Sequence, residues 1–162
     1  MMRCPIIALA AVLVACSPPT AAGPASAPEA QEQSAVHPIS GLPVIPLTVT
    51  GKSGAHSFRV ELAASDEAQI RGLMFRTELG DGEGMIFPSQ PPRPRSFWMR
   101  NTPIPLDIIF VGADRRILNI AANAVPYSLD SIPSAGPTSG VLELRGGRAA
   151  ELGIVPGDRV EW

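Results

Sequence analysis

The run LDIIFV, from Leu106 to Val111, is the most apolar segment of the chain after its first sixteen residues. Near-continuous runs of β-branched and aromatic residues of this length are typical of strands that are buried on both faces. We therefore predict that residues 106–111 form a central strand. Residues 116–121 are predicted to pair with it across a turn at residues 112–115.

A β-hairpin is predicted upstream of this strand. In residues 57–62 the apolar side chains of Phe58, Val60 and Leu62 alternate with polar ones, which places them on one face of a strand. Residues 47–50 are rich in β-branched residues and are joined to that strand by Gly51-Lys52-Ser53-Gly54, a plausible turn.

A short helix is predicted to follow the hairpin. Ser65 is a favourable N-cap, and Asp66 and Glu67 then lie in the first turn, where the helix dipole favours acidic side chains. The apolar residues expected to pack on one side of this helix are Ile70, Leu73 and Met74.

The rest of the C-terminal region is predicted to consist of short strands and turns. We expect a loop at the Pro-rich residues 88–95 and a second short helix at about 147–152, ended by Gly153. Further strands are expected at 96–100, 141–145 and 159–162. Seven or so short strands with one or two short helices predict a mainly β fold, a single compact sandwich or barrel.

Composition agrees with one β-rich domain. The chain has 162 residues, enough for one domain with an appendage. Its 18 Pro and 15 Gly argue against a helical bundle, because both residues disfavour helix interiors. The formal net charge of -2 argues against a nucleic-acid partner, and two Cys are too few for a disulfide scaffold.

The first sixteen residues have the features of a bacterial export signal. Arg3 precedes an apolar stretch from Pro5 to Ala15 that is too short to span a bilayer. The stretch ends in LVAC, which resembles the lipobox of bacterial lipoproteins. The resemblance implies that residues 1–15 are a lipoprotein signal peptide and that Cys16 is lipidated.

A lipidated Cys16 would place the protein on a membrane, since two or more acyl chains give stable anchoring. We expect it on the periplasmic side of the bacterial cell envelope, and Ser17 favours the outer membrane in a host that has two. Residues 16–46 are predicted to be a flexible Pro- and Ala-rich tether, because they contain seven Pro and no aromatic residue. Residues 47–162 are then the β domain.

Five motifs of this domain resemble a known family. They are RGLMFR (71–76), GMIF (84–87), FWMRNTPIPLDIIF (97–110), VLELRGG (141–147) and GIVPGDRVEW (153–162). In this order they resemble the bacterial and archaeal family called domain of unknown function 192. The resemblance implies a compact, mainly β, jelly-roll-like fold, and it implies no established activity.

The residue inventory of the domain excludes several kinds of chemistry. Residues 47–162 contain no Cys and a single His, His56, so a Cys–His pair and a multi-His zinc site are both excluded within one chain. There is no Walker-type phosphate loop and no dinucleotide-binding Gly motif. We therefore expect no metal and no cofactor.

Two carboxylates are weak catalytic candidates. Asp107 is the one acid inside the most apolar strand, and Glu143 interrupts the apolar run VLELR. Burial could separate their pKa values into those of an acid and a base, as glycoside hydrolysis requires. The alternative is structural, with Asp107 accepting hydrogen bonds and Glu143 on a partly solvated face.

A ligand-binding constellation is predicted around the stiff segment PIP (103–105). Trp98, Arg100 and Asn101 precede it and provide an aromatic plane, a cation and an amide at fixed positions, which suit a sugar, carboxylate or phosphate. Arg71 and Arg76 flank the end of the first helix and could converge on the same place. The alternative is a scaffold role, with Trp98 in the core and the arginines paired with acids.

Three hypotheses about function follow from these residues. The first is a non-enzymatic envelope lipoprotein that binds a small anionic or sugar ligand, or a protein partner. The second is a hydrolase of envelope glycan that uses Asp107 and Glu143. The third is a structural accessory of an envelope assembly.

Overall fold

The computed structural model describes residues 35–162. The predicted signal peptide, Cys16 and the first part of the predicted tether lie outside the described residues. Among the helices of residues 35–162, none has the length and apolar character needed to cross a membrane.

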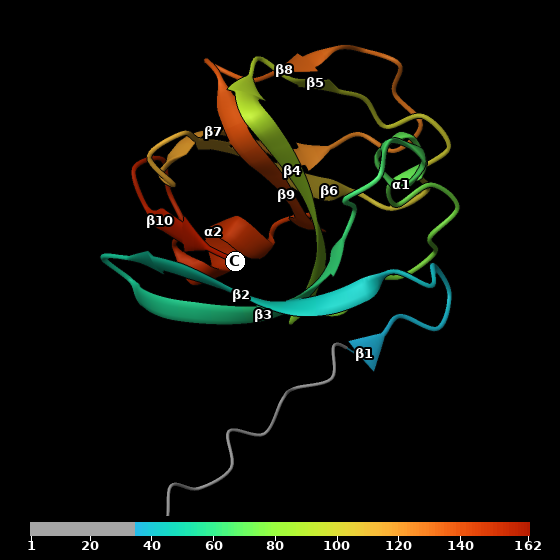
Figure 1. Ribbon diagram of the computed structural model, residues 1–162, viewed down its shortest axis with the longest axis horizontal. Helices are drawn as coiled ribbons and strands as arrows, with labels where there is room; N and C mark the ends of the chain where they lie inside the picture. The colour runs from blue at the N-terminus through green and yellow to red at the C-terminus, as the bar shows by residue number, and fades with distance from the viewer. Residues whose placement is uncertain (1–34) are drawn as a thin grey trace, which may run out of the picture. The chain divides into compact units, whose positions relative to one another are not determined.

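The described residues form a mainly β fold with two short helices, as predicted (Figure 1). The helices are α1 (Asp66–Arg71) and α2 (Arg148–Leu152). The strands are β1 (Ala35–Val36), β2 (Pro43–Gly51), β3 (Gly54–Leu62), β4 (Glu83–Arg93), β5 (Ser96–Phe97), β6 (Leu106–Gly112), β7 (Ile117–Ala124), β8 (Ile132–Pro133), β9 (Thr138–Arg145) and β10 (Arg159–Glu161).

Eight strands make one curved, mixed sheet. Its order is β1-β2-β3-β4-β9-β6-β7, with β10 also paired to β2, while β5 and β8 pair separately. The pair β3–β4 is parallel and the other pairs are antiparallel. The predicted hairpin is confirmed, because Gly51 faces Gly54 at the β2–β3 turn.

The last strand closes this sheet into a barrel. β10 runs along β2, and its other edge meets the start of β7 (Figure 1). There the Val160 amide donates to the Arg115 carbonyl at 2.8 Å, and the Ile117 amide donates to the Asp158 carbonyl at 2.9 Å. Closure leaves few unpaired strand edges, which stabilises a small β domain.

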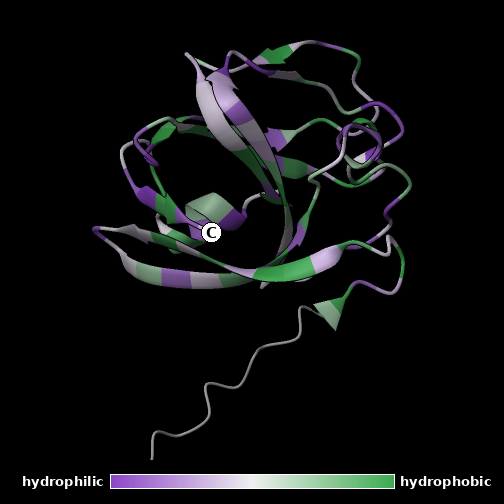
Figure 2. Cartoon of the chain, viewed as in Figure 1, coloured by the Kyte–Doolittle hydropathy of each residue, from purple (hydrophilic) through white to green (hydrophobic). Residues whose placement is uncertain are grey.

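β6 is buried on both faces, as predicted, since all seven of its residues are buried, and it is paired on both edges, with β9 and β7. Ile109 and Val111 belong to the cluster inside the barrel, whereas Ile108 and Phe110 belong to a second cluster on the outside of the sheet. Hydrophobic residues accordingly extend along β6 (Figure 2). α2 contributes to the inner cluster, and α1 covers the outer one.

α1 starts and α2 ends where the sequence predicts. The Ser65 side chain accepts a hydrogen bond from the Ala68 amide at the start of α1, and Gly153 ends α2 in a left-handed conformation. The prediction that Ile70 packs on the core is wrong, since 75% of this residue is exposed. α1 ends at Arg71, so Leu73 lies after the helix. Leu73 is buried, as predicted, and Ala68 is the buried residue of α1.

Residues 35–46 differ from the predicted tether. Val44 and Ile45 are paired with β3, and Ile45 packs against the inner cluster. The alternation of apolar side chains in VIPLTV therefore continues upstream of Leu47. The ordered domain begins before the predicted boundary at residue 47.

The predicted loop at 88–95 and the predicted strand at 96–100 are also corrected. Residues 88–93 belong to β4, and the register of this strand with β9 is irregular between Pro88 and Arg93. The strand predicted at 96–100 is shorter and comprises only the two residues of β5. The chain then turns, because the Thr102 amide donates to the Met99 carbonyl and Asn101 adopts a φ of 56°.

Gly84 provides a test of the packing between β4 and β9. A Cβ at this position would lie 2.5 Å from the Glu143 carbonyl oxygen and 2.9 Å from a Leu144 methyl carbon. We expect Gly84→Ala to lower the free energy of unfolding, measured by urea denaturation, by about 1–3 kcal/mol. Gly82→Ala is the control, because nothing lies within 4 Å of its Cβ. Equal stability of the two variants would contradict this packing.

Candidate functional site

A cavity of about 550 Å³ lies between α1 and the segment 95–102, on the outside of the barrel. Four of the five predicted ligand-binding residues line it, namely Arg71, Trp98, Arg100 and Asn101. The other lining residues come from α1 and the turn after it, from β4 and β5, and from β9: Gln69, Ile70, Gly72, Leu73, Met74, Phe87, Arg95, Ser96, Phe97, Thr102 and Glu143.

Backbone hydrogen bonds fix the loops at the mouth of this cavity. The Phe75 amide donates to the Asn101 carbonyl at 2.7 Å, and the Tyr127 amide donates to the Thr102 carbonyl at 3.1 Å. Phe75, Asn101 and Tyr127 all have positive φ, between 56° and 66°. Such backbone costs about 1–2 kcal/mol for each non-Gly residue, and strained residues cluster at functional sites.

The charged side chains around the cavity are mainly cationic. No carboxylate of residues 35–162 forms an ion pair with Arg71 or Arg100, and the Arg100 guanidinium lies 5.3 Å from the centre of the Trp98 ring. Arg95 donates to two neutral groups, the Ser89 hydroxyl at 2.8 Å and the Gln69 side-chain oxygen at 3.1 Å. These arginines create a positive potential that favours an anion.

Arg95 is the most buried of these three arginines. Burial lowers the pKa of its guanidinium, and the positive charge of Arg93 lowers it further. A guanidinium nevertheless stays charged at neutral pH. An anion in the cavity would therefore meet a partly desolvated cation, and this strengthens their attraction.

Aromatic side chains form the apolar part of the wall. Phe97 packs edge-on against Phe87, with ring centres 5.1 Å apart, and against Phe110 at 6.0 Å. Trp98 is 47% exposed at the mouth, so the alternative in which it packs in the core is wrong. Its ring is a platform that can stack on a flat or sugar-like ligand.

Glu143 is the one carboxylic acid among the lining residues. It is 5% exposed, and no residue of 35–162 donates a hydrogen bond to its side chain. Burial raises its pKa to about 8. The alternative of a partly solvated Glu143 is therefore wrong, and at neutral pH the group is mostly an uncharged acid.

Arg76 does not line the cavity, which corrects its predicted role. Its guanidinium is buried and donates to both carboxylate oxygens of Glu61 at 2.8 Å. His37 also lies 3.3 Å from Arg76 through Nδ1, and Ser40 donates to Glu61. Leaving either charge of this buried pair without its partner would be costly, so Glu61 holds Arg76 in the scaffold.

Asp107 and Glu143 lie on opposite faces of the sheet. Asp107 is paired with Leu144 of the inner cluster, whereas Glu143 is paired with Ile108 of the outer cluster. One residue of displacement along a strand reverses the direction of the side chain. The geometry therefore excludes the paired-carboxylate hydrolysis that we considered.

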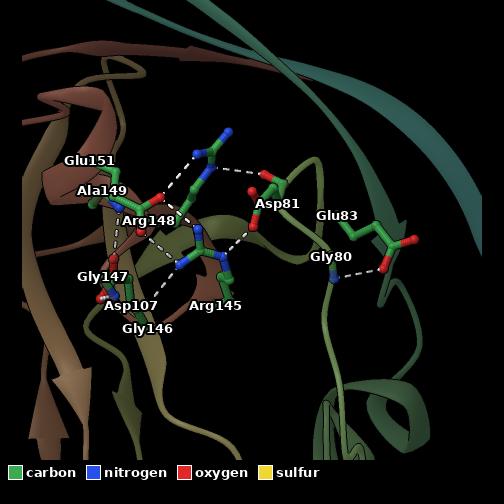
Figure 3. Close-up of polar contacts among 10 residues, drawn as sticks. All are labelled: Gly80, Asp81, Glu83, Asp107, Arg145, Gly146, Gly147, Arg148, Ala149 and Glu151. Carbon is green, nitrogen blue, oxygen red and sulfur yellow. Dashed lines mark hydrogen bonds and ion pairs between the residues drawn. The ribbon is translucent and has the colours of Figure 1, made fainter.

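The role of Asp107 is structural. Its carboxylate accepts hydrogen bonds from the amides of Gly147 at 2.9 Å and Ala149 at 2.8 Å (Figure 3). It also accepts one from the Asn123 amide at 2.8 Å. The residue before α2 is a glycine, which has no side chain to cap the helix. Asp107 supplies that cap from β6 and also benefits from the helix dipole.

A cluster of ion pairs lies near α2, away from the cavity. Arg145 donates to Asp81 and, at 2.9 Å, to Glu151, and Arg148 also binds Glu151 (Figure 3). Hydrogen bonds from Arg145 hold the pKa of both carboxyls below their usual range. These exposed pairs fix the turn at Asp81 and contribute little net stability.

Sequence reasoning missed the inner part of the site. Arg95 lies in the Pro-rich segment that was predicted to be a loop, and the alternation of a strand could not show that Glu143 faces a cavity. One signal was available, since an acid that shares a face with Val141 on a buried strand must be paired or face an opening.

The fold and the cavity define a class of protein, a small β barrel with a ligand-sized pocket on its outer surface. A family model described as uncharacterised, domain of unknown function 192 (DUF192), matches residues 47–162. The chain belongs to this family, as the sequence motifs predicted. No curated protein matches it.

Two solved structures are similar to this chain. A protein of unknown function from Novosphingobium aromaticivorans is 67% identical, with a TM-score of 0.78, over 79% of this chain and 91% of that one. A protein from Sinorhizobium meliloti, described as a candidate transcription regulator, is 39% identical, with a TM-score of 0.71, over 74% of this chain and 94% of that one.

Asp107→Asn tests the structural role of this carboxylate. An amide has one acceptor oxygen in place of two, so at least one of the three N–H groups, of which that of Ala149 is buried, loses its acceptor. We expect the free energy of unfolding to fall by about 1–3 kcal/mol in denaturant titrations. Asp114→Asn is the control, since this carboxylate accepts a hydrogen bond in an exposed turn and its loss changes stability by about 0.5 kcal/mol or less. An Asp107→Asn domain as stable as wild type would refute the assigned role.

Proposed function

We propose that the protein is an envelope lipoprotein, anchored through Cys16, whose DUF192 domain binds a small anionic ligand without catalysis. The observation that carries this proposal is the convergence of Arg71, Arg95 and Arg100, none of them in an ion pair within residues 35–162, on one 550 Å³ cavity. Unpaired cations around a cavity are a binding site for an anion.

The size and lining of the cavity support a small molecule. Ligand pockets usually measure about 300–1,000 Å³ and combine an apolar wall with a few polar groups. Here the wall is Phe87, Phe97 and Leu73, while the side chains of Gln69 and Asn101 provide polar contacts. A carboxylate with a ring or a sugar body fits this combination, because the ring can stack on an aromatic wall.

The same lining argues for binding rather than hydrolysis. Glu143 is the one acid of the cavity, and a glycoside hydrolase of the usual kind needs two carboxyl groups on either side of the scissile bond.

A protein partner is a second candidate, which the apolar residues beside the mouth favour. Phe75, Tyr127 and Leu129 are each 63% exposed or more, on loops that the backbone hydrogen bonds hold together. Exposed apolar residues that are grouped on a surface often mark a contact with another protein. An acidic terminus of such a partner could enter the cavity.

The description of the Sinorhizobium protein does not change this proposal. Twelve of the thirteen basic residues of our chain are Arg, but acids outnumber them, and the net charge is -2. DNA binding without a basic face would lack the phosphate contacts that supply most of its affinity.

Binding is testable with a panel of small anions. Thermal denaturation of the purified protein with glucuronate, benzoate or inorganic phosphate should show a rise in Tm of several degrees for at least one anion near 100 times its Kd. Arg71→Ala should weaken that binding about 10- to 100-fold, because a charge-assisted hydrogen bond is lost. Arg59→Ala, which removes an exposed arginine outside the cavity, should bind as wild type does. No Tm change with any anion, or equal effects of the two variants, would refute the proposal.

The anchor is testable independently of the ligand. Mass spectrometry of the protein from the membrane fraction should find a mature chain that begins with a diacylated Cys16. Cys16→Ser should abolish the lipid modification, and the protein should no longer fractionate as a mature lipoprotein. A mature chain with an unmodified Cys16, or one that is cleaved elsewhere, would contradict the anchor.

A further inference from the structure

Glu143 differs from the other residues of the cavity because it is buried and has no partner. It lies on β9, between Met85 of β4 and Ile108 of β6, and both of these neighbours are apolar. Its side chain lines the cavity and receives no hydrogen bond from residues 35–162. Its carboxyl oxygens are not among the fully enclosed, unpartnered atoms of residues 35–162, so they are open to the cavity, and their free hydrogen-bonding capacity is available to a ligand atom.

The charged groups around Glu143 leave it uncompensated. Arg71 on α1 and Arg95 and Arg100 on the neighbouring segment line the same cavity, but none is within ion-pair distance of Glu143. On its own strand, Arg145 is engaged by Asp81 and Glu151. Desolvation therefore dominates and raises the pKa of Glu143 to about 8, so the acid form exceeds the carboxylate about tenfold at pH 7.

We propose that Glu143 is a ligand-binding residue that acts as a neutral acid and donates a hydrogen bond to an oxygen atom of the bound anion. This inference rests on the proposed function, since it names the class of anion that the same cavity takes. The ligand is an oxygen-rich anion, such as an acidic sugar, with an acceptor oxygen separate from its carboxylate.

The arrangement of the lining explains this ligand class. The carboxylate pairs with exposed Arg71 and Arg100, and the ring stacks on Trp98, which is also exposed. The acceptor oxygen then reaches the buried Glu143. A ligand with an ammonium group is disfavoured, because the arginines of the cavity would repel it.

Proton linkage gives this inference a specific signature. Binding requires the protonated form of Glu143, which predominates below its pKa and is lost as the pH rises through about 8. Affinity should therefore be nearly constant from pH 6 to 7 and should fall towards tenfold per pH unit above 8. The two histidines of the described chain, His37 and His56, do not line the cavity.

The experiment is calorimetric titration of the full chain with glucuronate, galacturonate and gluconate from pH 6 to 9. Glu143→Gln keeps a hydrogen-bond donor of similar shape but cannot ionise, so its affinity, whatever its value at pH 6, should be the same at pH 9. Glu67→Gln, on the exposed side of α1, is the matched control and should keep the pH dependence of the wild type. Cyclohexanecarboxylate, which has no acceptor oxygen besides its carboxylate, should bind at least tenfold more weakly than the best acidic sugar.

The outcomes separate this inference from the proposed function. Binding of an acidic sugar that is independent of pH in wild type, or equally pH-dependent in Glu143→Gln, overturns the role of Glu143 and leaves anion binding intact. Tight binding of cyclohexanecarboxylate overturns the ligand class in the same way. If none of these anions, nor benzoate or phosphate, binds at pH 6, both the inference and the proposed function fail.

Discussion

Burial of β6 on both of its faces is the constraint on which the rest of the structure depends. Because side chains alternate along a strand, Ile109 faces the interior of the barrel while Ile108 and Phe110 face outwards. The inner residues are enclosed when β10 closes the sheet, and the outer residues need a separate cover, which α1 and the segment 95–102 provide. The cavity lies in that cover. A central strand with one polar face would need no cover, so the site exists because β6 is apolar on both sides.

The buried carboxylates of the domain differ in whether they have a hydrogen-bond or ion-pair partner. Asp107 accepts three amide hydrogen bonds, Glu61 is paired with Arg76, and Asp158 accepts from the Val155 amide at 2.9 Å. Glu143 has no such partner within residues 35–162. Burial raises its pKa to about 8, so at neutral pH this residue destabilises the folded domain relative to the unfolded chain, in which the carboxyl is ionised.

Much of the fold could be predicted from local patterns, and the parts that could not depend on distant residues. β6, the β2–β3 hairpin, the N-cap of α1 and the end of α2 follow from apolar runs, turn glycines and Ser65, all of which act within a few residues. Barrel closure depends on contacts between β10 and β7 that no local pattern specifies. The same difference holds for the site: Trp98, Arg100 and Asn101 are neighbours in sequence and were found together, whereas Arg76 was misplaced because its partner Glu61 is 15 residues away.

The loops at the mouth of the cavity are ordered by contacts within the domain itself. Three residues with side chains, Phe75, Asn101 and Tyr127, are held with positive φ by the hydrogen bonds between their loops. The entropic cost of ordering these loops is met during folding. Binding of the proposed anion would therefore not include that cost. A chance gap in the packing would need neither a strained mouth nor a buried acid at its inner end. Both features lower the stability of the domain and both are at the same cavity, which is what the proposed role in ligand binding predicts.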